Sequence, residues 1–137
     1  MRKNRTWYYT PGLLILVILV FLGCENKEYD RDKGPSDIRI KNMSSQVFDS
    51  IYVNTSGGEH SYGALNPGSE SEYKRYDFGY PIADISVYIN MVEYTYGPVN
   101  YTYEVWLGKG KFTYELSLAD TVSHTLSIEV TLDAPLD

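Results

Sequence analysis

Apolar and polar residues alternate with a period of two along most of the chain after residue 37. The clearest alternations cover residues 38–41, 47–53, 83–91, 101–107, 112–118 and 125–132. A period of two places one face of a strand against a core and the opposite face in water. No window of eleven or more residues after residue 37 keeps the period of about 3.6 that marks an amphipathic helix. The pattern therefore predicts an all-β domain.

Turn-forming residues separate these runs and indicate where the strands connect. Gly, Pro, Ser, Asn or Asp gather at residues 55–58, 66–68, 96–98, 108–110 and 118–120. About seven or eight short strands at roughly ten-residue spacing are typical of a single antiparallel β-sandwich. A small β-barrel is the alternative. We assign this domain to residues 37–137, because a chain of 137 residues has room for one domain.

Residues 1–23 have the pattern of a secretory signal peptide. A basic start is followed by an unbroken run of ten apolar residues at 13–22. At about 1.5 Å per residue this run covers about 15 Å, half of the roughly 30 Å hydrocarbon core of a bilayer. A permanent membrane span is the alternative, because no charge lies between Arg5 and Gly23, but a Pro-Gly pair interrupts that stretch.

The sequence around Cys24 resembles the lipoprotein box of bacterial lipoproteins. Phe21, Leu22 and Gly23 precede the cysteine, and the box has a small residue directly before an invariant cysteine. The resemblance implies that the Cys24 thiol carries a diacylglycerol, that the chain is cut before Cys24, and that fatty acids such as palmitate anchor it to the membrane. Two or more acyl chains hold a protein stably. Residues 25–36 contain one aromatic and no aliphatic residue, so we expect a flexible tether over residues 24–36.

Three segments of the chain after the tether resemble a family of small, uncharacterised Bacteroidetes-type lipoproteins. These are DIRIKN at 37–42, YGALNPGSESEY at 62–73 and LGKGKFTYEL at 107–116. The family implies one immunoglobulin-like or transthyretin-like β-sandwich, a lipid-anchored place in the cell envelope and no particular activity. Acidic residues after Cys24 resemble the export signal of surface lipoproteins of this type. We therefore expect the outer membrane, with periplasmic and surface display both open.

Charge and cysteine content exclude several kinds of site. The net charge is −6, and removal of the basic start leaves about nine basic against 18 acidic residues. A nucleic-acid partner requires a basic face, so we expect none. One cysteine forms no internal disulfide and no cysteine-based metal cluster, and two histidines with scattered acids make no metal set. We expect no cofactor and no metal.

Two carboxylates are the strongest catalytic candidates, and they are weak ones. Glu70 and Glu72 are two residues apart, which in a strand places their Cα atoms about 7 Å apart, within the range of a glycosidase acid–base pair. A solvated strand face gives the same spacing. His60 and His124 are accompanied by no nucleophile motif and are expected in turns or on the surface. We therefore expect no enzyme.

The aromatic residues are the main candidates for binding. Tyrosine occurs 14 times, and an exposed aromatic face can stack on sugar rings or hold a protein partner. Ordinary packing within a sheet is the alternative. The residues expected on such a face are Trp106, Tyr88, Tyr94, Tyr96 and Tyr76. We expect a structural or protein-interaction role in the envelope, with a surface glycan-binding module as the alternative.

Two short segments resemble an O-glycosylation sequon of exported Bacteroidetes-type proteins. Asp49-Ser50-Ile51 and Asp120-Thr121-Val122 both have the form Asp, then Ser or Thr, then an apolar residue. The resemblance implies that Ser50 and Thr121 are possible glycan acceptors.

Overall fold

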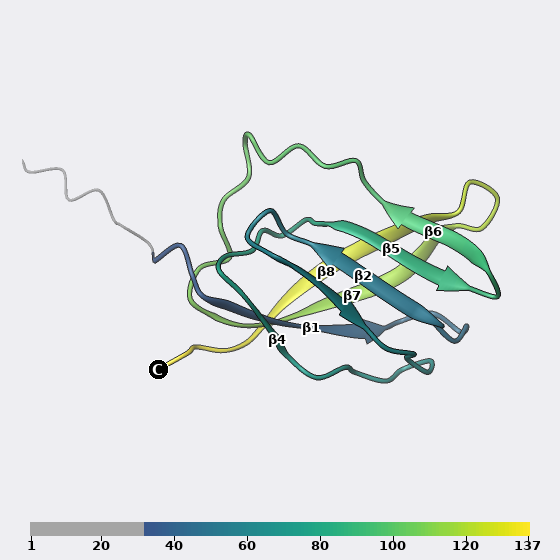
Figure 1. The fold of residues 1–137 in the computed structure, drawn as a ribbon, viewed down its shortest axis with the longest axis horizontal. Helices are drawn as coiled ribbons and strands as arrows, with labels where there is room; N and C mark the ends of the chain where they lie inside the picture. Colours follow the sequence, from purple (N-terminus) through teal and green to yellow (C-terminus); the bar gives the residue numbers. More distant parts are fainter. Residues whose placement is uncertain (1–31) are drawn as a thin grey trace, which may run out of the picture. The chain divides into compact units, whose positions relative to one another are not determined.

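The protein is described by a computed structural model of residues 32–137, in which every regular element is a β-strand (Figure 1). The strands are β1 (Ser36–Asn42), β2 (Ser50–Asn54), β3 (Glu59–Tyr62), β4 (Lys74–Tyr76), β5 (Asp84–Ile89), β6 (Val92–Tyr96), β7 (Gly110–Asp120) and β8 (Thr125–Ala134). The prediction of an all-β domain with seven or eight strands is confirmed. The expected signal peptide, Cys24 and residues 25–31 of the expected tether lie outside the described residues.

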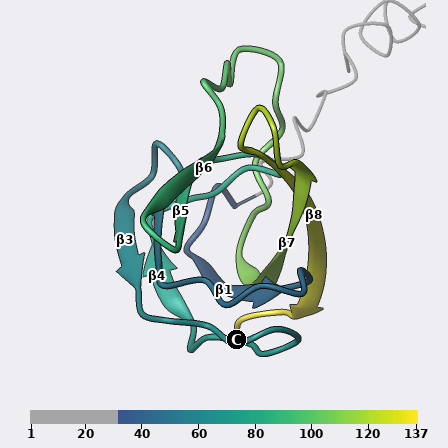
Figure 2. The same cartoon turned by 90° about the vertical axis from the view of Figure 1, so that its right-hand side faces the viewer.

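The eight strands form one sheet that curls into a nearly closed barrel (Figure 2). Their order is β3-β2-β5-β6-β8-β7-β1-β4. Most neighbours are antiparallel, but β1 pairs with β7 and β6 pairs with β8 in parallel. The sheet is therefore mixed rather than purely antiparallel, and it matches the barrel alternative more closely than two separate sheets.

The two edge strands of the sheet, β3 and β4, lie opposite each other. Side-chain contacts join them across this seam, in place of a ladder of backbone hydrogen bonds. The Tyr62 and Tyr76 hydroxyl oxygens are 3.2 Å apart, and His60 Nε2 lies 2.8 Å from the carbonyl oxygen of Arg75. One backbone bond crosses beside them, from the Asp77 N–H to the Gly57 oxygen at 2.8 Å. These contacts protect both edges, which would otherwise expose unpaired backbone groups.

The core is formed by the apolar residues of the alternating runs, whose side chains point inward from the strands. The fully buried side chains come chiefly from β1, β2, β5 and β7, and they include Ile38, Ile40, Ile51, Val53, Val87, Tyr114 and Leu116. Their polar neighbours on the same strands point outward, as a period of two requires. The alternations therefore predicted the inward faces correctly at residues 38–41 and 112–118 and over most of 47–53, 83–91 and 125–132. Three residues expected on the inward faces are exposed, because Val47 precedes β2, Met91 lies in the turn after β5 and Leu132 lies near the end of β8.

The alternation at residues 101–107 predicted a strand that does not form. This stretch belongs to the loop 97–109 between β6 and β7. A local turn replaces the ladder, because the Asn100 Oδ1 atom accepts hydrogen bonds from the Thr102 N–H at 2.9 Å and from the Thr102 hydroxyl at 2.6 Å. The Glu104 N–H then donates to the Tyr101 oxygen at 3.0 Å. Local side-chain bonds of this kind compete with strand pairing.

The folded domain begins before residue 37. Ser36 is fully buried in β1 and its hydroxyl donates to the Gly108 oxygen at 2.8 Å, while the Pro35 oxygen accepts from the Gly110 N–H at 3.2 Å. Residues 35 and 36, which the sequence assigned to the tether, thus belong to the domain. Within residues 32–137 no helix has the length and apolar character needed to cross a membrane.

Candidate functional site

An aromatic cluster covers the end of the domain at which the chain enters it. This proximal cluster consists of Lys33, Phe78, Tyr80, Tyr101 and Trp106. The Tyr80 and Tyr101 rings stack with centroids 4.6 Å apart, and the Phe78 ring meets Tyr80 edge-on at 6.0 Å. The Lys33 ammonium lies 3.8 Å from the Phe78 centroid and 4.9 Å from the Trp106 centroid, within the range of cation–π attraction.

Hydrogen bonds attach loop 97–109 to the proximal cluster and fix its path. The Trp106 Nε1–H donates to the Tyr80 hydroxyl at 2.9 Å, and the Tyr101 hydroxyl donates to the Asn54 oxygen at 3.2 Å. The Leu107 N–H donates to the Gly79 oxygen at 2.9 Å. Partial burial raises the pKa of the Tyr101 hydroxyl. The loop is thus held at several points, although it contains no strand.

The side chains between these points are exposed. Tyr103 exposes 93% of its surface, Val105 exposes 63% and Trp106 exposes 37%. Large apolar side chains that are this exposed on a fixed loop can contact another surface without rearrangement. Trp106 was expected on an exposed aromatic face of the sheet, whereas its exposure in the structure comes from its place in loop 97–109.

The five residues predicted to form one aromatic face do not lie together. Tyr76 is fully buried in the core, so its place on a binding face was predicted wrongly. Tyr88 points outward from β5, whereas Tyr94 and Tyr96 of β6 pack partly against the core. The reason is register, because Tyr94 and Tyr96 pair with the inward positions of β5. Trp106 lies apart from them in the proximal cluster.

A shallow groove of about 500 Å³ crosses the outer face of β2, β5 and β6. Its lining is mixed in character and includes Tyr52, Asn54, Asp84, Ser86, Thr95 and Tyr96. The Tyr52 hydroxyl donates to the Glu59 carboxylate at 2.5 Å, and this hydrogen bond raises the pKa of the hydroxyl. An aromatic ring beside hydroxyl, amide and carboxylate groups is a combination that binds polar ligands. Of the residues that line the groove, only Tyr96 was expected on a binding face. The alternation could not reveal the groove, because it assigns each outward residue to water and gives no sign of which strands are neighbours.

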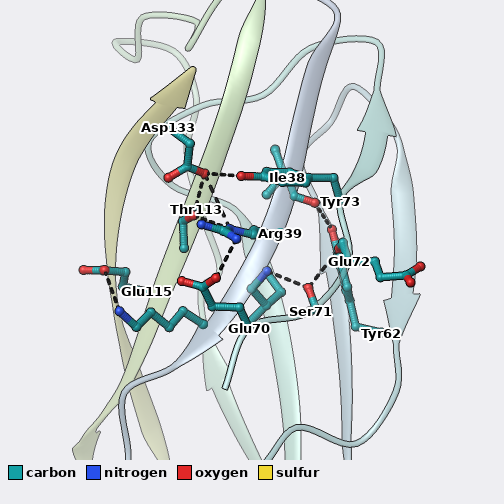
Figure 3. A network of polar contacts seen from close by, with 12 residues as sticks. Ile38, Arg39, Tyr62, Glu70, Ser71, Glu72, Tyr73, Thr113, Glu115 and Asp133 are labelled. Atoms are coloured by element: carbon teal, nitrogen blue, oxygen red, sulfur yellow. Dashed lines mark hydrogen bonds and ion pairs between the residues drawn. The ribbon is translucent and has the colours of Figure 1, made fainter. Parts of the chain in front are cut away.

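Glu70 and Glu72 do not form an acid–base pair. They precede β4 in an irregular segment, so the strand geometry assumed for them does not apply. Figure 3 shows their carboxylates pointing in different directions. Glu70 Oε2 lies 2.5 Å from Arg39 Nη1 in an ion pair, and both glutamates border a shallow pocket of about 290 Å³.

Arg39 is the centre of a polar network on the outer face of β1, β7 and β8 (Figure 3). Its Nε–H donates to the Thr113 hydroxyl at 2.9 Å, and its guanidinium lies over the Tyr73 ring at 4.9 Å. The Asp133 carboxylate accepts from the Thr113 hydroxyl at 2.6 Å and from the Tyr73 hydroxyl at 2.7 Å. Each group of the network is paired with another protein group, as in a structural clamp between strands.

The remaining candidates have structural partners or exposed positions. The His60 ring meets Tyr76 edge-on at 4.7 Å, and the His124 ring meets Tyr94 at 5.0 Å. Among residues 32–137, no three side chains of His, Cys, Asp or Glu gather in a way that could hold a metal ion. Ser50 is exposed at the start of β2, and Thr121 is exposed in the turn between β7 and β8. Both hydroxyls are therefore accessible to a modifying enzyme.

Comparisons with known proteins add one structural likeness. No protein-family model matches the chain, and no curated protein matches it. Among solved structures, the chain is similar to the NMR structure of a protein from Eubacterium rectale, at 14% sequence identity and a TM-score of 0.49. The similarity covers 74% of this chain and 92% of that chain.

Proposed function

We propose that this protein is a lipid-anchored lipoprotein of the cell envelope whose β domain has a structural or protein-interaction role. The observation that carries the proposal is the box at residues 21–24, which follows a basic start and an apolar run. The box ends at Cys24, the one cysteine of the chain. Its thiol is therefore at the position where lipoprotein processing attaches the diacylglycerol. The outer membrane is the proposed location, with either leaflet allowed.

The short distance between Cys24 and the folded domain supports this proposal. Lys33 already contacts the proximal cluster, and it follows Cys24 by nine positions. A lipid on Cys24 would therefore keep the domain close to the membrane. The three segments similar to small Bacteroidetes-type lipoproteins point to the same location. A catalytic role is not part of the proposal, because Glu70 is held by Arg39 and Glu72 points elsewhere.

Lipid labelling of the full chain in a bacterium tests the anchor. Cells fed an alkyne analogue of palmitate should label the wild-type protein and should not label Cys24→Ala. Intact-mass spectrometry of the labelled protein should give a chain that begins at residue 24 and carries lipid. A chain that still begins at Met1, or equal labelling of both proteins, would contradict the proposal.

Binding of a glycan is the second candidate, and the groove across β2, β5 and β6 favours it. Tyr52 offers a ring on which a sugar can stack, and Asp84, Ser86 and Thr95 lie beside it as hydrogen-bonding groups. The proposed glycan site would include Tyr96, one of the five residues expected on an aromatic face, and would not include Trp106.

A glycan array with matched variants tests this second candidate. Wild-type protein should bind a class of glycans that Tyr52→Ala and Asp84→Ala no longer bind. Tyr88→Ala is the control, because Tyr88 is an exposed aromatic residue of β5 that does not line the groove. Binding that persists in both groove variants would count against the site.

A further inference from the structure

The exposed apolar side chains of loop 97–109 lie beside the place where the chain enters the domain. Trp106 is within cation–π distance of Lys33, and Gly110, the first residue of β7, donates its N–H to the oxygen of Pro35. Ser36 is bonded to Gly108 of the loop. The loop that exposes Tyr103 is thus attached to the first residues of the domain.

The length of chain before Lys33 limits how far this end can stand from a lipid on Cys24. Nine positions separate the two residues, and a fully extended chain spans at most about 3.4 Å per residue, or about 30 Å in total. A flexible chain of this length has an average reach of about 17 Å. By comparison, the 11 residues of β7 alone cover about 36 Å at about 3.3 Å per residue. The proximal end of an anchored domain therefore stays within about 30 Å of the lipid on Cys24.

We propose that the proximal end is a membrane-contact surface, in which Tyr103, Val105 and Trp106 insert into the headgroup region of the bilayer. The inference rests on the proposed lipid anchor at Cys24. Trp and Tyr favour this region because their rings are apolar while the indole N–H or the hydroxyl can be hydrated. The anchor raises the effective concentration of the loop at the lipid surface, so a small gain per side chain suffices for contact.

The charges around the loop indicate which kind of lipid contact to expect. Lys33 and Lys109 are exposed here, Asp32 and Asp77 are exposed nearby, and Glu104 is half-buried within the loop. The negative charges slightly outnumber the positive ones, so this is no basic patch for anionic headgroups. Contact should therefore come from aromatic and apolar insertion, and it should persist on zwitterionic vesicles and at high salt.

The chain contains a natural reporter for this contact. Its two tryptophans are Trp7, within the expected signal peptide, and Trp106. A processed chain that begins at Cys24 therefore has Trp106 as its one fluorescent indole. The experiment uses lipidated protein purified from a bacterium, with its mass verified, in phosphatidylcholine vesicles whose acyl chains carry bromine near the headgroup. We expect about a twofold loss of Trp106 emission relative to unbrominated vesicles, because an indole at the interface lies near the bromines.

Two double variants identify the surface that makes the contact. Tyr103→Ser with Val105→Ser should remove most of the quenching, because it takes two exposed apolar groups from the loop. Met91→Ser with Val122→Ser is the matched control, because these residues are 94% and 88% exposed at the far hairpins and should leave quenching unchanged. Circular dichroism should show both variants folded, as expected for exposed positions.

The outcomes separate the contact surface from the anchor. Protein whose mass shows no lipid on Cys24 overturns the anchor and this inference together. Lipidated protein whose Trp106 emission is the same in brominated and unbrominated vesicles overturns this inference alone. The inference is also overturned if both double variants lose quenching equally, or if the loop instead joins two copies of the chain, seen as a concentration-dependent dimer in detergent that Tyr103→Ser with Val105→Ser abolishes.

Discussion

The two ends of the domain are built in different ways. At the proximal end, contacts join segments far apart in the sequence, as in the bonds from Ser36 to Gly108 and from Tyr114 to Tyr80. At the hairpin end, formed by the turns between β5 and β6 and between β7 and β8, bonds within each turn are added to a few longer-range ones, such as the bond from the Asn90 N–H to the Asp49 carboxylate at 2.7 Å. Asp120, for example, accepts hydrogen bonds from the N–H groups of Val122 at 2.7 Å and Ser123 at 3.3 Å. The hairpin end therefore relies more on bonds within its own turns, whereas the proximal end relies more on contacts between distant segments.

The same contrast extends into the core, where tyrosine hydroxyls are buried toward the proximal end. Tyr76 pairs with Ser36, and the Tyr114 hydroxyl donates to the Tyr80 oxygen at 2.5 Å. The Tyr62 hydroxyl donates to the Ile38 oxygen at 2.8 Å. Toward the other end the buried side chains of β5 and β8 are aliphatic, such as Ile89 and Leu126. The proximal half of the core therefore depends on polar groups that must remain neutral and paired.

Alkaline pH should act on this polar half and produce the largest loss of stability. Burial raises the pKa of Tyr76 to about 12, and it raises the pKa values of Tyr62 and Tyr114 further. An unfolded tyrosine ionises near pH 10, so above pH 10 the unfolded chain has lost protons that the folded chain retains. The contribution of these three groups to the free energy of unfolding is therefore nearly constant below about pH 9 and falls above it, by roughly 3 kcal/mol for the three groups between pH 10 and 11.

Urea unfolding at pH 9, 10 and 11 measures this loss, and Tyr76→Phe tests its origin. The variant removes one of the three ionisable groups, so its loss between pH 10 and 11 should be about two-thirds of the wild-type loss. The comparison is made on the pH slope, because any change already present at pH 9 reflects the missing hydroxyl itself. Equal slopes for the two proteins would show that Tyr76 does not contribute.

Gly57→Ala should cause the next largest loss, through close backbone packing at the proximal end. A Cβ atom at Gly57 would lie 2.2 Å from the oxygen and 2.7 Å from the nitrogen of Phe78. Neither atom belongs to a side chain that can rotate away, so the strand seam must shift, and we expect a loss of about 3 kcal/mol. Gly63→Ala is the control, because its Cβ meets nothing within 4 Å. Thermal unfolding should separate the two variants clearly, and similar midpoints would contradict the packing argument.

The same contrast explains what sequence could predict. Alternation located β1, β2, β5, β7 and β8, because a strand with one buried face must repeat every two residues whatever its partners are. It also predicted strand pairing at residues 101–107, where Tyr101 and Trp106 instead bind residues of 54–80. It gave no signal for β3 or β4, which are four and three residues long and pair at the edges of the sheet. The proximal cluster could not be predicted, because its members come from three separate segments that only the closed sheet brings together.

Ser36→Ala should cause a smaller loss that still exceeds any serine change at the hairpin end. The Ser36 hydroxyl is fully buried and donates to the oxygen of Gly108, which is also buried. Its removal leaves a buried carbonyl with one partner fewer, and such a loss costs about 1.5 kcal/mol. Ser123→Ala is the control, since the Ser123 hydroxyl is exposed, and it should change stability by less than about 0.5 kcal/mol. Chemical denaturation of both variants measures the difference, and equal stabilities would remove the distinction between the ends.

Met91→Gly should have the smallest effect and the opposite sign, because the hairpin end contains strain that a local change can relieve. Asn90 and Met91 form the two-residue turn between β5 and β6, with φ angles of 48° and 63°. Positive φ at both positions suits an Asn-Gly pair, and a side chain at the second position is strained by about 1–2 kcal/mol. Glycine removes this strain but adds freedom to the unfolded chain, so we expect a net gain of about 0.5 kcal/mol.

The denaturation midpoint measures this gain, and Met43→Gly is the matched control. Met43 is also an exposed methionine, but its φ is not positive, so glycine there brings only greater freedom in the unfolded chain and should lower the midpoint. A rise for Met91→Gly together with a fall for Met43→Gly would locate the strain in the turn. A fall in both would mean that Met91 is stabilised by contacts at the hairpin end, and the two ends of the domain would then differ less than their hydrogen bonds indicate.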